Sequence, residues 1–100
     1  NAMASEEEST GHDLVVEKTI GQTDIRYNIC TFGSKFHIGF GVSVTIIING
    51  NTYQCRTHNT AKGRIDGMKR LYAENGIGVG DVLRATYMAE SHEILLEKIS

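Results

Sequence analysis

The sequence predicts a small, mainly β domain with one or two short helices (α+β), in the form of a partly open barrel. Residues 42–57 form two apolar, alternating runs around Asn49-Gly50-Asn51, which is the pattern of a β-hairpin. A short run with helical spacing follows at residues 66–75, and two more alternating runs close the chain. One short helix cannot cover both faces of such a sheet, so we expect the sheet to curl around its own core with the helix plugging one end.

The first residues are set apart from this domain. Residues 1–11 begin with Asn-Ala-Met-Ala, which is typical of the remnant of an expression tag, and continue with three glutamates followed by Ser, Thr and Gly. This composition predicts a solvated, disordered tail. We therefore expect a single β-barrel-like domain over residues 12–100, a length that suits one hydrophobic core.

The charge of the expected domain is close to neutral. The whole chain carries 10 Lys and Arg against 12 Asp and Glu, a net charge of −2; without the three glutamates of the tail the balance is 10 against 9, about +1. The strongly basic total that favours nucleic-acid binding is therefore absent, although a basic patch on one face is compatible with this balance.

The expected environment follows from the cysteines and the hydropathy pattern. Two cysteines are too few for a disulfide-rich secreted scaffold, and the sequence shows neither a signal peptide nor an apolar run of membrane-spanning length. We expect a soluble cytoplasmic protein, a monomer or a homodimer, with no membrane partner.

The elements before and within the hairpin follow from alternation. Residues 12–29 predict two strands around a turn at Gly21-Gln22, because apolar and aromatic residues recur on both sides of it. Residues 31–41 are punctuated by glycine and predict a loop. On the second hairpin strand, alternation places Tyr53, Cys55 and Thr57 on one face and Gln54, Arg56 and His58 on the other.

The helix and the closing strands follow from caps and spacing. Asp66 is expected to cap the start of the helix by accepting a backbone N–H, and Asn75-Gly76 is expected to end it. Met68, Leu71 and Tyr72 lie three and four residues apart and therefore share a core-facing side. A Gly-Asp turn then leads into the last hairpin, with strands over residues 82–88 and 93–99.

Catalytic and metal chemistry are only weakly indicated. Cys55 and His58 have the residue types of a nucleophile and its base, but strand alternation puts them on opposite faces. A zinc site built from this pair with Cys30 and His37 would lack the tight spacing of structural zinc knuckles. The sequence contains no evident carboxylate pair and no Gly-Lys-Ser/Thr motif. We therefore expect no enzyme, no catalytic residue, no metal and no cofactor.

The strongest functional candidate is a basic segment. Five of the ten cationic residues lie within fifteen positions, interrupted by only one acidic residue, Asp66. Arg and Lys suit phosphates, and Asn suits base edges. The alternative for this segment is a solvated loop without a binding role. The cationic residues are Arg56, Lys62, Arg64, Lys69 and Arg70.

A glycine-rich loop offers a second candidate. Lys35 and His37 lie within it, and two loops of a small barrel can face the same side. Phe32, Phe36 and Phe40 from the same stretch can either cover the core or offer a stacking surface for bases. We expect at least two of the three in the core.

The last part of the chain resembles a known family. Residues 63–98, GRIDGMKRLYAENGIGVGDVLRATYMAESHEILLEK, are similar to the final section of DNA-binding pseudobarrel domains, which include the plant B-three transcription-factor domain and the effector domain of the restriction endonuclease EcoRII. The shared pattern is a helix with an aromatic, here Tyr72, a Leu-x-x-Gly-Asp motif and a closing hairpin. Ile77 replaces the Leu, and Gly80-Asp81 match. The resemblance implies a pseudobarrel that grips the DNA major groove with two arms, near 21–24 or 33–39 and near 56–64.

The same stretch is also similar to the AbrB-type swapped-hairpin DNA-binding unit. A proline normally follows the Gly-Arg-Ile of that unit, and this chain has none. Residues 12–57 also exceed what that short unit needs. We therefore prefer the monomeric pseudobarrel.

These observations predict a small nucleic-acid-binding module whose expected partner is double-stranded DNA. In residues 56–64, Arg and Lys side chains are expected at phosphates and His, Asn and Thr side chains near base edges, while residues 35 and 37 form the second arm. The alternative is a protein-interaction or oligomerisation module without nucleic-acid binding, in which an exposed strand edge pairs with a partner. The expected interface residues are Lys35, His37, Arg56, His58, Asn59, Thr60, Lys62 and Arg64.

Overall fold

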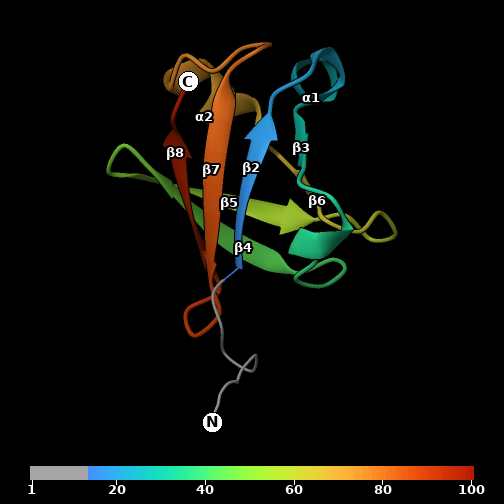
Figure 1. Cartoon of the computed structure of the whole chain (residues 1–100). Coiled ribbons are helices and arrows are strands. Elements are labelled where there is room, and N and C mark those ends of the chain that lie inside the picture. The colour runs from blue at the N-terminus through green and yellow to red at the C-terminus, as the bar shows by residue number, and fades with distance from the viewer. Residues whose placement is uncertain (1–13) are drawn as a thin grey trace, which may run out of the picture.

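The computed structural model describes residues 14–100 as one curled β-sheet with two short α-helices (Figure 1). The predicted tail, residues 1–11, lies outside the described residues. The elements in chain order are β2 (Leu14–Thr19), α1 (Gln22–Tyr27), β3 (Ile29–Thr31), the 3-10 helix η1 (Ser34–Phe36), β4 (Ser43–Ile48), β5 (Asn51–Thr57), β6 (Arg64–Asp66), α2 (Lys69–Glu74), β7 (Val82–Met88) and β8 (Glu93–Lys98).

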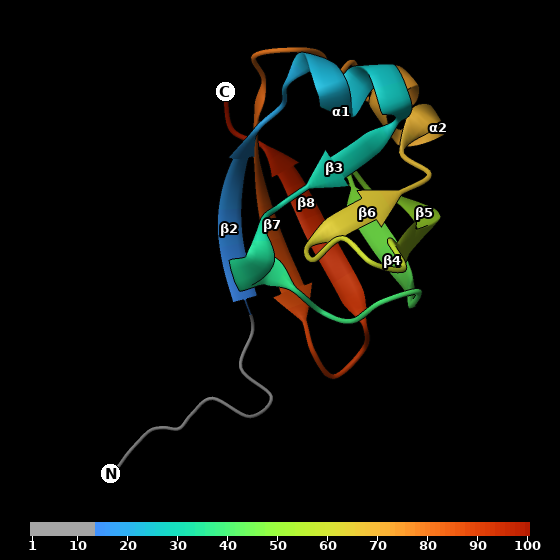
Figure 2. The same ribbon diagram turned by 90° about the vertical axis from the view of Figure 1, so that its right-hand side faces the viewer.

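The sheet has seven strands in the order β2-β7-β8-β4-β5-β6-β3. All neighbouring pairs are antiparallel except β4 and β8, which are parallel. The sheet curls so that β3 and β6 stand across from β2, β7 and β8 (Figure 2). Its two edge strands, β2 and β3, are not paired with each other, so the barrel stays open. The predicted mainly β, partly open barrel is confirmed.

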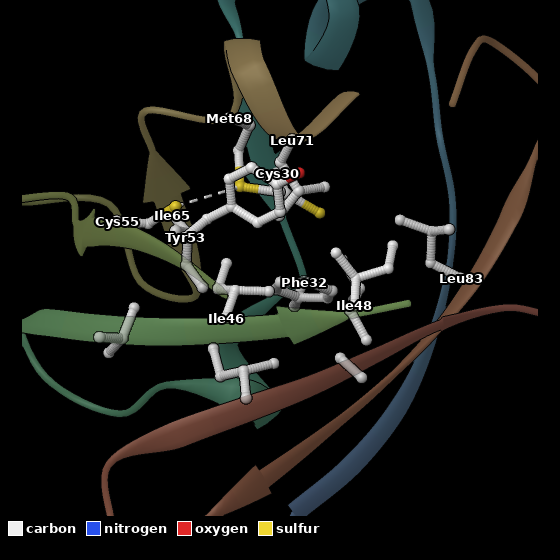
Figure 3. Close-up of a cluster of buried hydrophobic side chains, with 14 of the residues drawn as sticks. Cys30, Phe32, Ile46, Ile48, Tyr53, Cys55, Ile65, Met68, Leu71 and Leu83 are labelled. Atoms are coloured by element: carbon white, nitrogen blue, oxygen red, sulfur yellow. Dashed lines mark hydrogen bonds between the residues drawn. The ribbon is translucent and has the colours of Figure 1, made fainter. Parts of the chain in front are cut away.

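The core fills the inside of this half-barrel. Side chains from strands on both sides and from α2 meet in one buried cluster (Figure 3). Tyr53, Cys55 and Thr57 share one face of β5, as predicted, and this face is buried. Met68, Leu71 and Tyr72 are buried as the core-facing side of the helical segment. Both α-helices lie over the same end of the barrel (Figures 1 and 2). Within residues 14–100, no helix is long and apolar enough to cross a membrane.

The hairpin between β4 and β5 has the predicted turn. Asn49 has a φ of 51° and Gly50 a φ of 79°, and positive values at both central residues are typical of the type I′ turn. This turn matches the twist of the flanking strands, and it fixes the register in which Ile48 faces Asn51. The hairpin is therefore a rigid base for the segment that follows β5.

The predicted strand after Gly21 is wrong, because residues 22–27 form α1. The backbone N–H of Gly21 donates to the Asp24 carboxylate at 2.9 Å, and Lys18 pairs with the same carboxylate at 3.1 Å. Asn28 then ends the helix with a left-handed φ of 57°. These polar contacts favour a helical turn, and they outweigh the short alternation of Ile25 and Tyr27 that suggested a strand.

The predicted helix cap at Asp66 is also wrong. Residues 64–66 pair with β3 and β5 as the short strand β6, and the Asp66 carboxylate accepts a hydrogen bond from Arg64 Nε at 2.8 Å. The helix begins only at Lys69 and has no side-chain cap. Its end is as predicted, since Gly76 adopts a φ of 63° and the Ile77 N–H donates to the Tyr72 carbonyl at 3.0 Å.

Candidate nucleic-acid interface

Two loops that are far apart in the chain lie against each other. The Phe32 N–H donates to the Gly63 carbonyl at 2.8 Å. A Cβ atom on Gly63 would lie only 2.0 Å from the Gly33 carbonyl oxygen, so the two backbones meet with no room for a side chain. The antiparallel pairing of β3 with β6 produces this contact, because Thr31 faces Arg64 and the residues that follow on each side continue against each other (Figure 2). We call residues 33–41 and 56–64 together the loop surface.

His58 shapes the second of these loops. Its Nδ1 accepts the backbone N–H of Thr60 at 3.1 Å and that of Ala61 at 3.0 Å. The backbone N–H of His58 donates to the Arg64 carbonyl at 2.9 Å, and the backbone carbonyl of His58 accepts the Gly41 N–H at 3.3 Å. Nδ1 is therefore occupied as an acceptor, and the imidazole can offer only Nε2 to a ligand.

The cations of the loop surface differ in how far they are neutralised. Lys35, Arg56 and Lys62 are exposed, and within residues 14–100 none of them has a carboxylate at ion-pair distance. Arg64 is different, because its Nε lies 2.8 Å from the Asp66 carboxylate. Asp66 is also the cross-strand partner of Arg56 in the β5–β6 register. Among the described residues, the surface thus carries three cations without a carboxylate partner and one, Arg64, that is paired with Asp66.

The four other ion pairs in this part of the chain lie away from the loop surface. In each of these pairs, a neighbouring carboxylate already neutralises the cation. These pairs are Lys18–Asp24, Arg70–Glu74, Arg84–Glu17 and Lys98–Asp81.

An open depression runs beside β5 from the loop surface towards α2. A hollow of about 340 Å³ contains Arg56 and Asp66 in its wall, and a second of about 360 Å³ contains Lys69 and Arg70. Both hollows share Gln54 and Gly67 in their lining, so they adjoin. Arg56 is a predicted interface residue, and the alternation that buries Tyr53 also places Gln54 on this outer face, although Gln54 was not among the predicted interface residues.

The polar side chains of the two loops converge near Gly41. A Cβ atom on Gly41 would lie 2.8 Å from Asn59 Oδ1 and 3.9 Å from Arg56 Nη2. The structure thus brings Arg56, His58 and Asn59 together against the glycine-rich loop. Lys35 stands apart from them, because η1 lies against β2 on the other side of the barrel opening (Figure 2).

His37 is only partly available to a ligand. Its Nδ1 is buried and has no hydrogen-bond partner among the described residues. Its ring packs against Phe40, with a distance of 4.5 Å between ring centroids. Phe32 and Phe36 are buried, as predicted for at least two of the three phenylalanines, and Phe40 is exposed.

The two thiols belong to the core. Cys55 lies on the inner face of β5, with its sulfur 3.9 Å from that of Met68 (Figure 3), whereas His58 lies outside this core cluster. Burial raises the pKa of Cys30 to about 12 and that of Cys55 to about 11. Neither thiol is therefore a thiolate near neutral pH, and Cys55 is not placed to act with His58 as a nucleophile. In residues 14–100, no three His, Cys, Asp or Glu side chains gather as metal ligands.

Comparison of the chain with protein-family models and with curated proteins found no match.

Proposed function

We propose that the protein binds nucleic acid through the loop surface, with double-stranded DNA as the expected ligand. The observation that carries this proposal is the contact between two distant loops, which carry three exposed cations without a carboxylate partner in residues 14–100: Arg56 and Lys62 on one loop, and Lys35 farther away on the other. Cations without a carboxylate partner are free to replace the counterions at phosphates. Asn59 and Thr60, exposed between them, supply the amide and hydroxyl groups that contact base edges.

The scaffold supports this proposal. Residues 56–64 are held by the β5–β6 pairing, by the two N–H bonds to His58 and by the close contact of Gly63 with Gly33. A surface that is already ordered loses little conformational entropy when it binds a ligand. The half-barrel is also the architecture that the pseudobarrel resemblance implies, although a fold by itself does not determine a function.

Binding through a strand edge receives less support. On the edge strand β2, Lys18 lies on the partly buried face, and its Nζ is 3.1 Å from the Asp24 carboxylate. The other edge strand, β3, has only three residues. Inward-pointing charges and short edge strands are features by which proteins prevent edge-to-edge pairing.

A second candidate function rests on the outer face of the sheet. Val15 is 62% exposed and Leu95 is 36% exposed. Both lie in one cross-strand row, in which each faces Thr86 of β7. Thr86 lies between these two exposed apolar side chains, and exposed apolar surface is typical of protein contacts. This row is therefore where a self-associating or protein-binding function would act. Sedimentation equilibrium of the unchanged chain and of Leu95→Glu tests it, since an oligomer joined by this face becomes monomeric in the variant.

Fluorescence anisotropy with a labelled duplex and its single strand tests the nucleic-acid proposal. At low salt, Arg56→Ala and Lys62→Ala are each expected to weaken duplex binding several-fold, because each removes a phosphate contact. The matched control is Arg26→Ala, which removes an exposed cation from α1, at the end of the barrel that the helices cover. The absence of binding at low salt, or an equal loss in the control, contradicts the proposal.

A substitution in the Arg64–Asp66 pair is expected to strengthen duplex binding, whereas the alanine variants above weaken it. Asp66→Asn removes the carboxylate that holds Arg64 and faces Arg56 across the strands. Duplex binding is therefore expected to become several-fold tighter in this variant, since two guanidinium groups lose a competing anion. Unchanged or weaker binding would show that neither arginine contacts phosphate.

A further inference from the structure

One aromatic side chain of the loop surface is exposed where its neighbours are buried. Phe40 is 46% exposed, whereas Phe32 is 7% and Phe36 only 1% exposed. The two glycines beside it have positive φ values, 131° at Gly39 and 62° at Gly41. Side chains rarely tolerate such backbone angles, so this glycine pair lets the loop hold Phe40 outside the core.

The exposed ring is supported from within the same loop. The His37 ring lies 4.5 Å from the Phe40 ring, at an interplanar angle of 52°. The Nδ1 atom of His37 is buried and has no hydrogen-bond partner in residues 14–100. Phe40 is thus backed by one aromatic ring while nearly half of its surface is open to a ligand.

Groups that recognise nucleotides surround the same point of the loop. Gly41 follows Phe40 in the chain. A Cβ atom on Gly41 would lie 2.8 Å from Asn59 Oδ1 and 3.9 Å from Arg56 Nη2. An amide and a guanidinium therefore lie beside Gly41, and the exposed Phe40 ring belongs to the preceding residue of the same loop. They match the base face, the base edge and the phosphate of one nucleotide.

We infer that the loop surface binds nucleic acid containing an unpaired base, which stacks on Phe40 with its edge towards Asn59. In a fully paired duplex the faces of each base are covered by its neighbours, so a side-chain ring can stack only on a base that has left the helix or has no partner. This inference rests on the proposed function and names the class of substrate for it.

The test compares two labelled duplexes of the same sequence, one fully paired and one with a single bulged 2-aminopurine. The unchanged chain is expected to bind the bulged duplex about tenfold more tightly, the contribution of one stacked base. Stacking on Phe40 is also expected to change the 2-aminopurine fluorescence. In Phe40→Leu the ratio of the two affinities should fall to near one, whereas Phe40→Trp, which keeps an aromatic ring, should retain it.

The possible results separate the inference from the proposed function. Equal affinity of the unchanged chain for the two duplexes, or an unchanged ratio in Phe40→Leu, overturns the inference and leaves nucleic-acid binding in place. No binding of either duplex at low salt overturns both. Because Phe40 is exposed, Phe40→Leu should keep the thermal unfolding temperature of the unchanged chain, and this measurement confirms that the variant is folded.

Discussion

His58 shows how one side chain sets the geometry of a binding loop. Its position two and three residues before the N–H groups of Thr60 and Ala61 is that of an Asn or Asp in a side-chain-capped turn. The sequence placed this residue at base edges, and the structure shows that one of its nitrogens already holds the backbone. This hydrogen bonding depends on how the loop folds, and no local pattern indicated it.

The role of His58 leads to a prediction about stability. His58→Ala leaves two backbone N–H groups without their acceptor, so the free energy of unfolding should fall by about 1 kcal/mol. His58→Asn keeps an acceptor at the same place and should recover most of this loss. Urea unfolding measures both changes. An Asn variant as unstable as the Ala variant would mean that the ring packs the loop and that its acceptor has no role.

Asp81 gives the pH dependence that the structure predicts most directly. The Gly78 N–H donates to its carboxylate at 2.8 Å, and this bond, with Lys98 beside it, holds the pKa of Asp81 below its ordinary value of 3.8. A carboxylate with a lower pKa in the folded state contributes stability that is complete above its unfolded pKa. This contribution is lost as the pH falls below about 4, through the folded pKa.

Asp81→Asn should therefore flatten the acid side of the stability curve. The variant is expected to lose less free energy of unfolding than the unchanged chain between about pH 5 and pH 2, because one protonation step is gone. Glu90→Gln, in the exposed β7–β8 hairpin, is the control for removing a single carboxylate. Denaturant unfolding across this pH range measures the effect, and identical acid losses in Asp81→Asn and the unchanged chain would exclude this role.

At the scale of elements, the contact of Gly63 with Gly33 joins the two loops. Gly63 has a φ of 71°, and Gly50 in the β4–β5 turn has a φ of 79°, but only Gly63 is crowded by another backbone. A side chain at either position strains the backbone by about 1–2 kcal/mol. A side chain at Gly63 must in addition push the two loops apart.

Gly63→Ala should therefore destabilise the protein by at least about 2 kcal/mol more than Gly50→Ala, since the overpacking cost adds to the backbone strain. Thermal or urea unfolding of the two variants compares them directly. Because the contact aligns the loop surface, Gly63→Ala should also weaken duplex binding, while Gly50→Ala should not. Similar stabilities of the two variants would contradict the close contact of the loops.

The elements themselves were predictable where their pattern is long. The β4–β5 hairpin and the closing strands have sustained alternation and strong turn residues, and these were predicted correctly. The helix α1 and the strand β6 were not, since each depends on partners that are distant in sequence. Asp24 needs Lys18 of β2, and Arg64 to Asp66 need β3 and β5 on either side.

At the scale of the whole molecule, the order of the strands in the sheet makes the candidate site. Residues 33–41 and 56–64 were each recognised from composition as polar or basic loops. Their meeting depends on the pairing of β3 with β6 at one end of the sheet order, which neither loop encodes by itself. The sequence did not predict the ion pair of Arg64 with Asp66, because it placed Asp66 at a helix cap and residues 64–66 form a strand.

The salt dependence of duplex binding is the most direct test of whether the loop surface contacts phosphates. The logarithm of the association constant falls with the logarithm of salt concentration by about 0.9 for each phosphate contact on a duplex. If Lys35, Arg56 and Lys62 contact phosphates, the triple alanine variant should show a slope shallower by about 2.7, whereas Arg26→Ala should keep the slope of the unchanged chain. An unchanged slope in the triple variant, or an equal change in the control, would contradict binding through the loop surface.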